Sequence, residues 1–303
     1  MTEPYLERLA RRSAATGTVL CLGLDPDPRA LPDGFAETLE GVERFAGLIV
    51  EAAVPFAAAV KANLAFFEAF GAAGIAALER IRALVPSDVP FIADAKRADI
   101  GSTAARQATA LYEFLGADAV TLNPYLGADA IRPFIESNGG FAYVLCRTSN
   151  ATAPELQGVE VGANSSLGAP AEPLYARVAR LVEGWDSGNR LGLVVGATSA
   201  AELGSIRAIV PGLAFLVPGV GAQGGAIEPV LAAGPGVAPP AGGRAGGGLL
   251  VNVSRGIAGA IGSGTSATTT TPFGSALSTP IQDVGERLAS AAAEWATRLP
   301  VLS

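Results

Sequence analysis

The chain has 303 residues, of which 50% are hydrophobic, and it carries a formal net charge of −7. A chain of this length and composition can bury one large core or two modest ones. The negative charge argues against nucleic-acid or anionic-membrane partners, which demand a basic surface, but it allows a small anionic ligand held by local positive groups. The chain contains no histidine, so general acid and base chemistry would depend on lysine and carboxylate side chains.

Near the N-terminus, a group of arginines is not followed by an apolar core with a small-residue cleavage site. We therefore expect no signal peptide and a cytoplasmic location. Cys21 and Cys146 both lie inside apolar runs. This placement predicts two reduced thiols in the core and no disulfide framework.

Short apolar runs typical of β-strands alternate with longer helical patterns along the chain, which indicates βαβ units and a parallel sheet. The predicted strands are residues 19–24, 56–60, 90–93, 119–122, 141–145, 191–195, 214–217 and 249–253. The clearest predicted helices are residues 42–53, 64–84, 102–115, 172–183 and 283–298. Eight such repeats favour a closed barrel, so the predicted fold class is α/β, a TIM (β/α)8 barrel forming a single domain over residues 1–303.

Two segments differ from this alternation in composition. Residues 234–248 are rich in proline and glycine, and residues 262–280 are rich in serine, threonine and glycine. Neither segment is long enough or apolar enough to form a domain. We expect both to be flexible loops.

Nearly every predicted strand is followed by a polar residue, and in a barrel these positions meet at the C-terminal face, where active sites lie. In chain order they are Asp25, Lys61, Asp94 with Lys96, Asn123, Thr148 with Ser149, Thr198, Gln223 and Arg255. Any one of them alone is more often a turn former or a helix cap. The complete series predicts a polar site at one rim of the barrel.

The most informative local feature is the segment 93–103, in which two carboxylates flank a lysine at the end of an apolar run. Asp94 and Lys96 share a strand face because side chains two residues apart point the same way. Asp99 follows in the turn that opens the next helix, near enough to hold the Lys96 ammonium from its other side and keep it protonated. The alternative is a surface ion-pair cluster, in which Asp99 caps a helix and Lys61 is a solvated strand end.

Two further loops predict a phosphate site. Residues 218–225 follow the seventh predicted strand, and their glycines allow backbone N–H groups to approach an anion closely. Residues 253–257 follow the eighth strand and add the guanidinium of Arg255, whose forked geometry suits phosphate oxygens. The loops after strands seven and eight are where barrels of this kind often bind phosphate.

With these motifs the chain resembles the orotidine 5′-phosphate decarboxylase family, in the type 2 branch found in actinobacteria and relatives. Residues 94–103 match the family's Asp-x-Lys-x-x-Asp signature and its continuation. The further matches are Leu24-Asp25-Pro26, Val60-Lys61, Ala65-Phe66-Phe67-Glu68, Thr148-Ser149-Asn150, the loop 218–225 and Ser254-Arg255. The chain departs from the family at Ala62, where relatives often have proline, and at Ala98, where glycine is common.

The resemblance implies a barrel that works as a homodimer with sites at the interface, without a metal or a cofactor. By this resemblance Asp99, Ile100 and Thr103 would reach into the partner's site. The implied catalytic network, of alternating charge around C6 of a pyrimidine, is Lys61, Asp94, Lys96 and Asp99. The implied ligand contacts are Asp25 and Thr103 to ribose hydroxyls, Ser149 to the pyrimidine, Pro218 near the base, and Gln223 with Arg255 to the phosphate.

The implied activity is cofactor-independent decarboxylation of orotidine 5′-monophosphate to uridine 5′-monophosphate, the last step of de novo pyrimidine biosynthesis. The residues are compatible with it, because Lys96 is placed to stabilise negative charge at C6 and to donate a proton there.

Two alternatives remain open. The first is a Mg²⁺-dependent sugar-phosphate decarboxylase or aldolase of the same superfamily, and Lys61 argues against it because metal-dependent relatives tend to have an acidic ligand at that strand end. The second is a catalytically silent barrel that binds nucleotides, which would have little need for all four charged residues.

Overall fold

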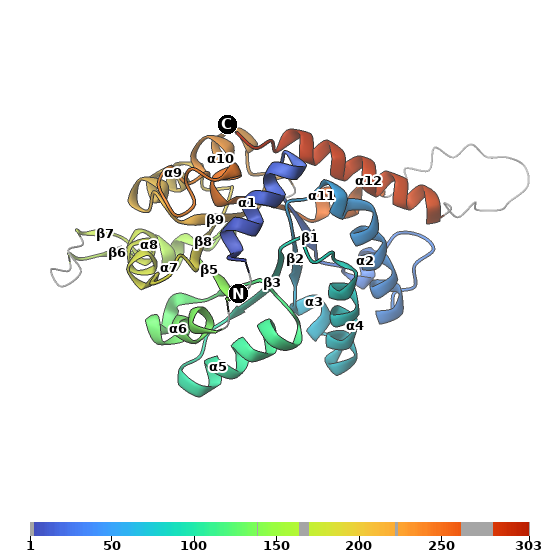
Figure 1. The fold of residues 1–303 in the computed structure, drawn as a ribbon, viewed down its shortest axis with the longest axis horizontal. Helices are drawn as coiled ribbons and strands as arrows, with labels where there is room; N and C mark the ends of the chain where they lie inside the picture. Colours follow the sequence, from blue (N-terminus) through green and yellow to red (C-terminus); the bar gives the residue numbers. More distant parts are fainter. Residues whose placement is uncertain (1–2, 138, 164–169, 222–223, 262–280, 303) are drawn as a thin grey trace, which may run out of the picture.

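The structure is a computed structural model that describes residues 3–137, 139–163, 170–221, 224–261 and 281–302. Eight parallel strands close into a barrel in the order β1-β10-β9-β8-β5-β4-β3-β2, with helices around it (Figure 1). The strands are β1 (Leu20–Leu24), β2 (Ala59–Asn63), β3 (Phe91–Arg97), β4 (Ala119–Leu122), β5 (Phe141–Arg147), β8 (Leu191–Val195), β9 (Ala214–Pro218) and β10 (Leu249–Val253). The predicted TIM (β/α)8 barrel is confirmed.

The strands form at continuous apolar runs because a parallel sheet covered by helices is buried on both faces. Every residue of β1, β4, β8 and β10 is buried. The prediction for the second strand, residues 56–60, is wrong in position, since Val54–Phe56 form a 3₁₀ turn at Pro55 and β2 begins at Ala59. β3 and β5 continue beyond their predicted ends, to Arg97 and Arg147, and the added part of β3 carries Asp94 and Lys96 into the barrel mouth.

The helices pack around the barrel with their apolar sides inward. They are α1 (Tyr5–Thr16), α2 (Leu39–Ala53), α3 (Ala65–Glu68), α4 (Gly71–Leu84), α5 (Gly101–Thr109), α6 (Ala128–Glu136), α7 (Pro154–Gln157), α8 (Leu174–Trp185), α9 (Ala200–Ile209), α10 (Ile227–Ala233), α11 (Arg255–Ala258) and α12 (Ile281–Arg298). Figure 1 shows α12 lying beside α2, which closes the ring between the last and the first βα repeats.

Three predicted helices differ from the observed ones. The helix predicted over residues 102–115 is an α-helix only to Thr109 and continues as a π-helix over Ala110–Phe114. The helix predicted over residues 64–84 is divided into α3 and α4 because Gly71 has a φ of +64°, a left-handed conformation that ends one helix before the next begins. The helix predicted from residue 172 begins at Leu174, since Glu172–Pro173 form strand β7. β7 pairs antiparallel with β6 (Glu160–Val161) in a small sheet outside the barrel.

The N-terminal end of the barrel is closed by α1, which crosses it in Figure 1. Tyr5, Leu6 and Leu9 of this helix are buried in one cluster with inward-facing residues of the strands. The inner strand residues of this cluster include Cys21, Ala59, Ile92, Ala119, Phe141, Tyr143, Ala214 and Leu250. Because side chains fill this end, a ligand can enter only from the opposite face.

The proline- and glycine-rich segment 234–248 packs against α1 and the start of β9. The Gly236 N–H donates to the Gly247 carbonyl at 2.8 Å, and the Val237 N–H donates to the Pro211 carbonyl at 2.9 Å. Ala241 is fully buried in the same cluster as Leu9. The predicted flexibility of this segment stays a prediction, and the predicted loop 262–280 lies outside the described residues.

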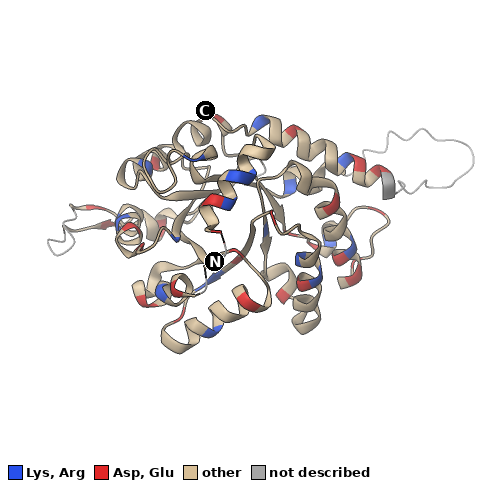
Figure 2. Ribbon diagram, in the orientation of Figure 1, with Lys and Arg blue, Asp and Glu red and all other residues tan. Residues whose placement is uncertain are grey.

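Charged residues of both signs are spread over the outer helices in Figure 2. Cys21 and Cys146 are free and buried, and burial raises the pKa of the Cys21 thiol to about 12. Within the described ranges, no helix combines the length and the apolar character that a membrane crossing requires.

Candidate active site

A cavity of about 480 Å³ opens at the carboxyl ends of the strands. Seven of the eight barrel strands contribute to its wall or floor. The strand residues are Lys61 and Asn63 of β2, Asp94 and Lys96 of β3, Thr121 of β4, Leu145 of β5, Val194 of β8, Leu216 and Pro218 of β9, and Asn252 of β10. Asp25, which follows β1, lines the cavity as well, as do Ser149, Gly219, Ser254 and Arg255.

Four charged groups of alternating sign line up along one side of this cavity. The Lys61 Nζ lies 3.9 Å from Asp25 Oδ1 and 2.8 Å from Asp94 Oδ2, and the Lys96 Nζ lies 2.6 Å from Asp94 Oδ1. Lys61 and Lys96 are the only lysines in the chain. Both ammonium groups therefore converge on one carboxylate, and 47% of the Lys96 side chain remains exposed to the cavity and solvent.

The two buried members of this array hold each other in the charged state. Burial opposes ionisation of Asp94, but the charges of Lys61 and Lys96 and their hydrogen bonds outweigh it, so the pKa of Asp94 lies well below its usual value. Burial also disfavours a charged Lys61, yet the negative charges of Asp94 and Asp25 raise the pKa of Lys61 above its usual value. The pair is thus ionised at neutral pH.

Asp99 does not take the place expected for it within one chain. Within the described residues, Lys96 forms an ion pair with Asp94 and none with Asp99. Asp99 Oδ1 instead accepts a hydrogen bond from the Ile100 N–H at 2.8 Å. The expectation that Asp99 holds the other side of the Lys96 ammonium is therefore wrong for a single subunit. The reason is that the chain leaves the barrel wall after Arg97 and turns outward into α5.

The other predicted ligand-binding residues are divided between the cavity and its surroundings. Ser149, Pro218 and Arg255 line the cavity together with Asp25. Ile100 is 57% exposed, and both it and Thr103 lie beyond the end of β3, outside the cavity as the described residues form it. Gln223 lies outside the described residues.

Two of the polar residues predicted at the rim have local structural roles. Asn123 Oδ1 accepts the Tyr125 N–H at 3.0 Å and caps a short 3₁₀ turn after β4. The Thr198 hydroxyl donates to the Ser149 carbonyl at 3.3 Å and so holds the loop after β5. Both side chains act on loops around the cavity rather than on its interior.

Several cavity residues have no counterpart in the sequence prediction. They are Asn63, Thr121, Leu145, Gln157, Val194, Leu216 and Asn252. Asn252 is 9% exposed, and its Oδ1 has no hydrogen-bond partner among the described residues. A single polar residue inside an otherwise apolar strand, as at Thr121 and Asn252, is the signal that could have revealed two of them.

Gln157 of α7 organises the loop that carries Ser149. Its Oε1 accepts the Thr148 N–H at 2.9 Å, and its Nε2 donates to the Thr148 Oγ1 at 2.8 Å. Thr148 Oγ1 in turn donates to Asn150 Oδ1 at 2.6 Å. These paired contacts fix the backbone on both sides of Ser149 at the cavity wall.

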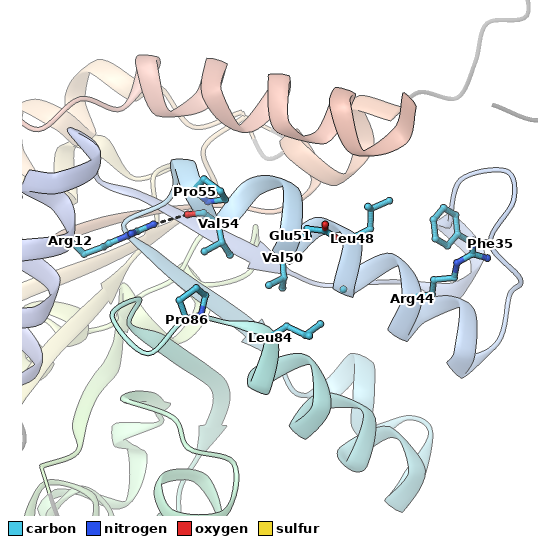
Figure 3. A pocket seen from close by; sticks show the side chains of 11 residues that line it. Arg12, Phe35, Arg44, Leu48, Val50, Glu51, Val54, Pro55, Leu84 and Pro86 are labelled. Atoms are coloured by element: carbon cyan, nitrogen blue, oxygen red, sulfur yellow. Dashed lines mark hydrogen bonds between the residues drawn. The ribbon is translucent and has the colours of Figure 1, made fainter. Parts of the chain in front are cut away.

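A second cavity, of about 720 Å³, lies on the outer surface between α2 and the end of α4 (Figure 3). Its wall is mostly apolar, with Phe35, Leu48, Val50, Val54 and Leu84 among its residues. Arg12, at one end, donates to the backbone carbonyls of Val54 at 2.9 Å and Ala57 at 3.1 Å. This cavity is larger than the first, but its charged residues, Arg12, Arg44 and Glu51, form no ion pair with one another, so the cavity at the strand ends is the better candidate for an active site.

Comparison with known proteins shows the family to which the chain belongs. A family model described as "Orotidine 5'-phosphate decarboxylase / HUMPS family" matches residues 18–268. Orotidine 5'-phosphate decarboxylase of Herpetosiphon aurantiacus is 42% identical over 254 residues, covering 84% of this chain and 88% of that protein. The enzyme of the same name from Thermomicrobium roseum is 44% identical over 257 residues, covering 84% and 86% respectively.

The fold comparison agrees with the sequence comparison. The solved structure of Leishmania donovani UMP synthase matches with a TM-score of 0.77 and 36% identity over 98% of this chain. This chain spans 56% of the length of that protein. Because the family model matches most of the sequence and these relatives are more than 40% identical to it, the chain belongs to the orotidine 5′-phosphate decarboxylase / HUMPS family.

Proposed function

We propose that this protein is a carboxy-lyase that converts orotidine 5′-monophosphate to uridine 5′-monophosphate, in the biosynthesis of pyrimidine nucleotides. The observation that carries the proposal is the array of Asp25, Lys61, Asp94 and Lys96 around one cavity. Loss of CO₂ from C6 of the substrate leaves a carbanion on the ring, and an ammonium fixed beside it stabilises that charge as it develops. The relatives from Herpetosiphon aurantiacus and Thermomicrobium roseum are both named orotidine 5'-phosphate decarboxylase, which supports the proposal.

In this proposal, Lys96 is the residue that acts directly on C6, the reacting carbon. Its ammonium lies at the cavity and is held through Asp94 Oδ1 at 2.6 Å. In the proposed reaction the C6–CO₂ bond breaks, its electron pair stays on C6, and Lys96 donates a proton to that carbon. Because Lys96 is already oriented before the substrate arrives, little reorganisation is needed at the moment of reaction.

Asp94 and the proposed phosphate site also contribute to lowering the reaction barrier. Asp94, beside the substrate carboxylate, repels it in the bound state and is relieved as CO₂ leaves, although stabilisation of the transition state is the larger effect. Arg255 and the backbone of Gly219 lie on the opposite side of the cavity, where they can hold the phosphate. Binding energy gained there orients the pyrimidine over Lys96.

We further propose a homodimer in which Asp99, Ile100 and Thr103 complete the partner's site. Ile100, Tyr125 and Leu126 are 57%, 79% and 49% exposed, and they follow the neighbouring strands β3 and β4. Large apolar side chains exposed together beside an active site are typical of an interface. In such a dimer the partner's Asp99 would supply the second carboxylate that Lys96 lacks within its own chain.

A Mg²⁺-dependent reaction on a sugar phosphate is the alternative within the same family. The position of Lys61 disfavours it, since this buried ammonium occupies Asp94 Oδ2 at 2.8 Å while Lys96 occupies Oδ1. A divalent ion bound to Asp94 would have to displace one of these ammonium groups. A catalytically silent nucleotide-binding barrel would gain nothing from two lysines converging on a single buried carboxylate.

The decisive experiment follows the absorbance of orotidine 5′-monophosphate with purified protein, without cofactor and with a metal chelator. We expect turnover by the wild-type protein and a loss of about 10³-fold or more for Lys96→Ala. Arg11→Ala, which removes an exposed cation from α1 at the other end of the barrel, is the control and should retain full activity. Unchanged turnover in Lys96→Ala would contradict the mechanism, and loss of turnover with the chelator would favour the metal-dependent alternative.

The finer assignments rest on the same motifs. We infer that the chain belongs to the actinobacterial-type branch of the family, on the matches at 65–68 and 148–150 as well as the segment 94–103. We also infer a cytoplasmic enzyme, because free buried thiols at Cys21 and Cys146 are typical of a reducing compartment.

A further inference from the structure

Thr121 is a buried polar residue at the floor of the cavity, and it contacts both halves of the Asp94–Lys96 pair. Its hydroxyl donates to Asp94 Oδ1 at 2.8 Å and accepts a hydrogen bond from the backbone N–H of Lys96 at 2.9 Å. The residue is 1% exposed. One hydroxyl group therefore links the carboxylate of Asp94 to the backbone of the lysine.

The strand geometry explains why Lys96 needs this partner. In the pairing of β3 with β4, Ala93 is opposite Val120 and Arg97 is opposite Leu122, so three residues of β3 face Thr121 alone. Such a bulge removes residues from the regular backbone ladder and re-aims their side chains. The Lys96 N–H, displaced from the ladder, finds the Thr121 hydroxyl as its acceptor.

The bulge also places Lys96 in an unusual backbone conformation. Its φ is +47°, one of two positive values among the described residues that are not glycine. A lysine in this region is strained and persists only where its surroundings hold it. Because the surroundings must hold this strained backbone in place, they also fix the direction in which the Lys96 side chain leaves it.

We propose that Thr121 is a positioning residue of the decarboxylase, which fixes the Lys96 ammonium and the Asp94 carboxylate in their relative orientation before the substrate binds. The inference rests on the proposed function. Thr121 acts through Asp94 and Lys96 rather than on the substrate. Without its hydroxyl, Asp94 Oδ1 keeps only the Lys96 side chain as a partner, and the backbone of Lys96 is free to leave the left-handed conformation.

The test is Thr121→Val, which keeps the shape of the side chain and removes the hydroxyl. We expect kcat for orotidine 5′-monophosphate to fall by about 10- to 100-fold, with KM changed by less than about threefold because the phosphate contacts are untouched. Thr121→Ser, which restores the hydroxyl, should recover most of kcat. If Thr121→Val does not fold, Thr121→Ala is compared with Thr121→Ser in the same way.

Thr18→Val is a matched control at the other end of the barrel. Thr18 is also fully buried, donates to the Leu299 carbonyl at 2.7 Å and accepts the Leu20 N–H at 3.1 Å. Thr18→Val should lose thermal stability as Thr121→Val does but keep its kcat. Equal kcat values for the two valine variants, or a serine variant as slow as the valine variant, would overturn the proposal.

A second measurement does not depend on activity. Because the chain has only two lysines, ¹⁵N-lysine labelling gives two backbone amide signals, which Lys96→Arg assigns. We expect the amide hydrogen of Lys96 to exchange at least about tenfold faster in Thr121→Val than in the wild type or Thr18→Val. An unchanged exchange rate overturns the proposed role of Thr121, whereas a wild-type protein that fails to turn over the nucleotide overturns the proposed function alone.

Discussion

Asp94 is the residue on which the charged array depends. It receives hydrogen bonds from the ammonium groups of Lys61 and Lys96 and from the hydroxyl of Thr121, while only 9% of it is exposed. A buried carboxylate costs free energy unless each oxygen is paired, and here both oxygens are. The carboxylate to which we assign a catalytic role therefore also stabilises the folded barrel mouth.

Asp94→Asn should lower the free energy of unfolding by about 3–5 kcal/mol at pH 7, because it leaves the buried Lys61 without its nearest counter-charge. The pKa of Asp94 is lowered in the folded state. Its stabilising effect is therefore complete above the unfolded pKa of about 3.9 and is lost as the pH falls toward the folded pKa. Urea unfolding should show a difference between wild type and Asp94→Asn that is constant between about pH 5 and 8 and shrinks below about pH 4.

Asp33→Asn provides the control for loss of one negative charge, because Asp33 is exposed. Its unfolding free energy should remain within about 0.5 kcal/mol of the wild-type value. A difference for Asp94→Asn that stays constant down to pH 3 would mean that Asp94 is not held ionised by the two lysines.

At the scale of the element, α1 seals the end of the barrel opposite the active site. Leu9 of this helix is 1% exposed. The Arg8 Nη1 lies 2.6 Å from Asp118 Oδ1, and Asp118 Oδ2 accepts the Phe91 N–H at 2.8 Å. The helix is thus joined to the start of β3, the strand that carries Asp94 and Lys96, the proposed catalytic pair, at its other end.

Leu9→Ala should destabilise the protein by about 2–5 kcal/mol, because it leaves a cavity beneath the barrel where the strands cannot collapse to fill it. KM and kcat at 25 °C should stay within about twofold of wild type, since the helix lies at the end away from the site. Thermal and urea unfolding measure the loss. Leu84→Ala, at a leucine that is 58% exposed, is the control and should cost less than about 0.5 kcal/mol; equal effects of the two variants would contradict the buried role of α1.

At the scale of the whole molecule, one subunit contains Asp25, Lys61, Asp94 and Lys96 around its cavity, while Asp99 lies beyond it. The exposed Ile100 and Tyr125 lie beside this outer segment. A second copy of the chain could cover these apolar side chains and bring its own Asp99 to the site.

Mixing inactive variants tests this arrangement directly. Lys96→Ala and Asp99→Ala should each be inactive, but subunits exchanged between them form mixed dimers in which one of the two sites is intact. We expect the mixture to regain about a quarter of wild-type activity, since about half of the dimers are mixed and half of their sites are intact. Light scattering gives the dimer mass, and a mixture no more active than its components would exclude shared sites.

Much of the fold and part of the site follow from local sequence. Apolar runs of strand length, separated by helical patterns, predict the barrel because the alternation of a buried strand with an amphipathic helix requires it. The same alternation places Asp25, Lys61, Asp94 and Lys96 at one rim, where the cavity contains them. The spacing of Asp94 and Lys96 on one strand face is also a local property.

Other features depend on contacts between residues far apart in the chain. The bulge opposite Thr121 and the position of Asp99 away from Lys96 have no local signature, since they result from how β3 pairs with β4 and where the chain then leaves the barrel wall. The sequence by itself determined the closed barrel and the charges at its mouth, because hydrophobic periodicity and strand ends are local. Only the tertiary structure decided which carboxylate pairs with which lysine, because that choice depends on distances of a few ångströms set by packing across the barrel.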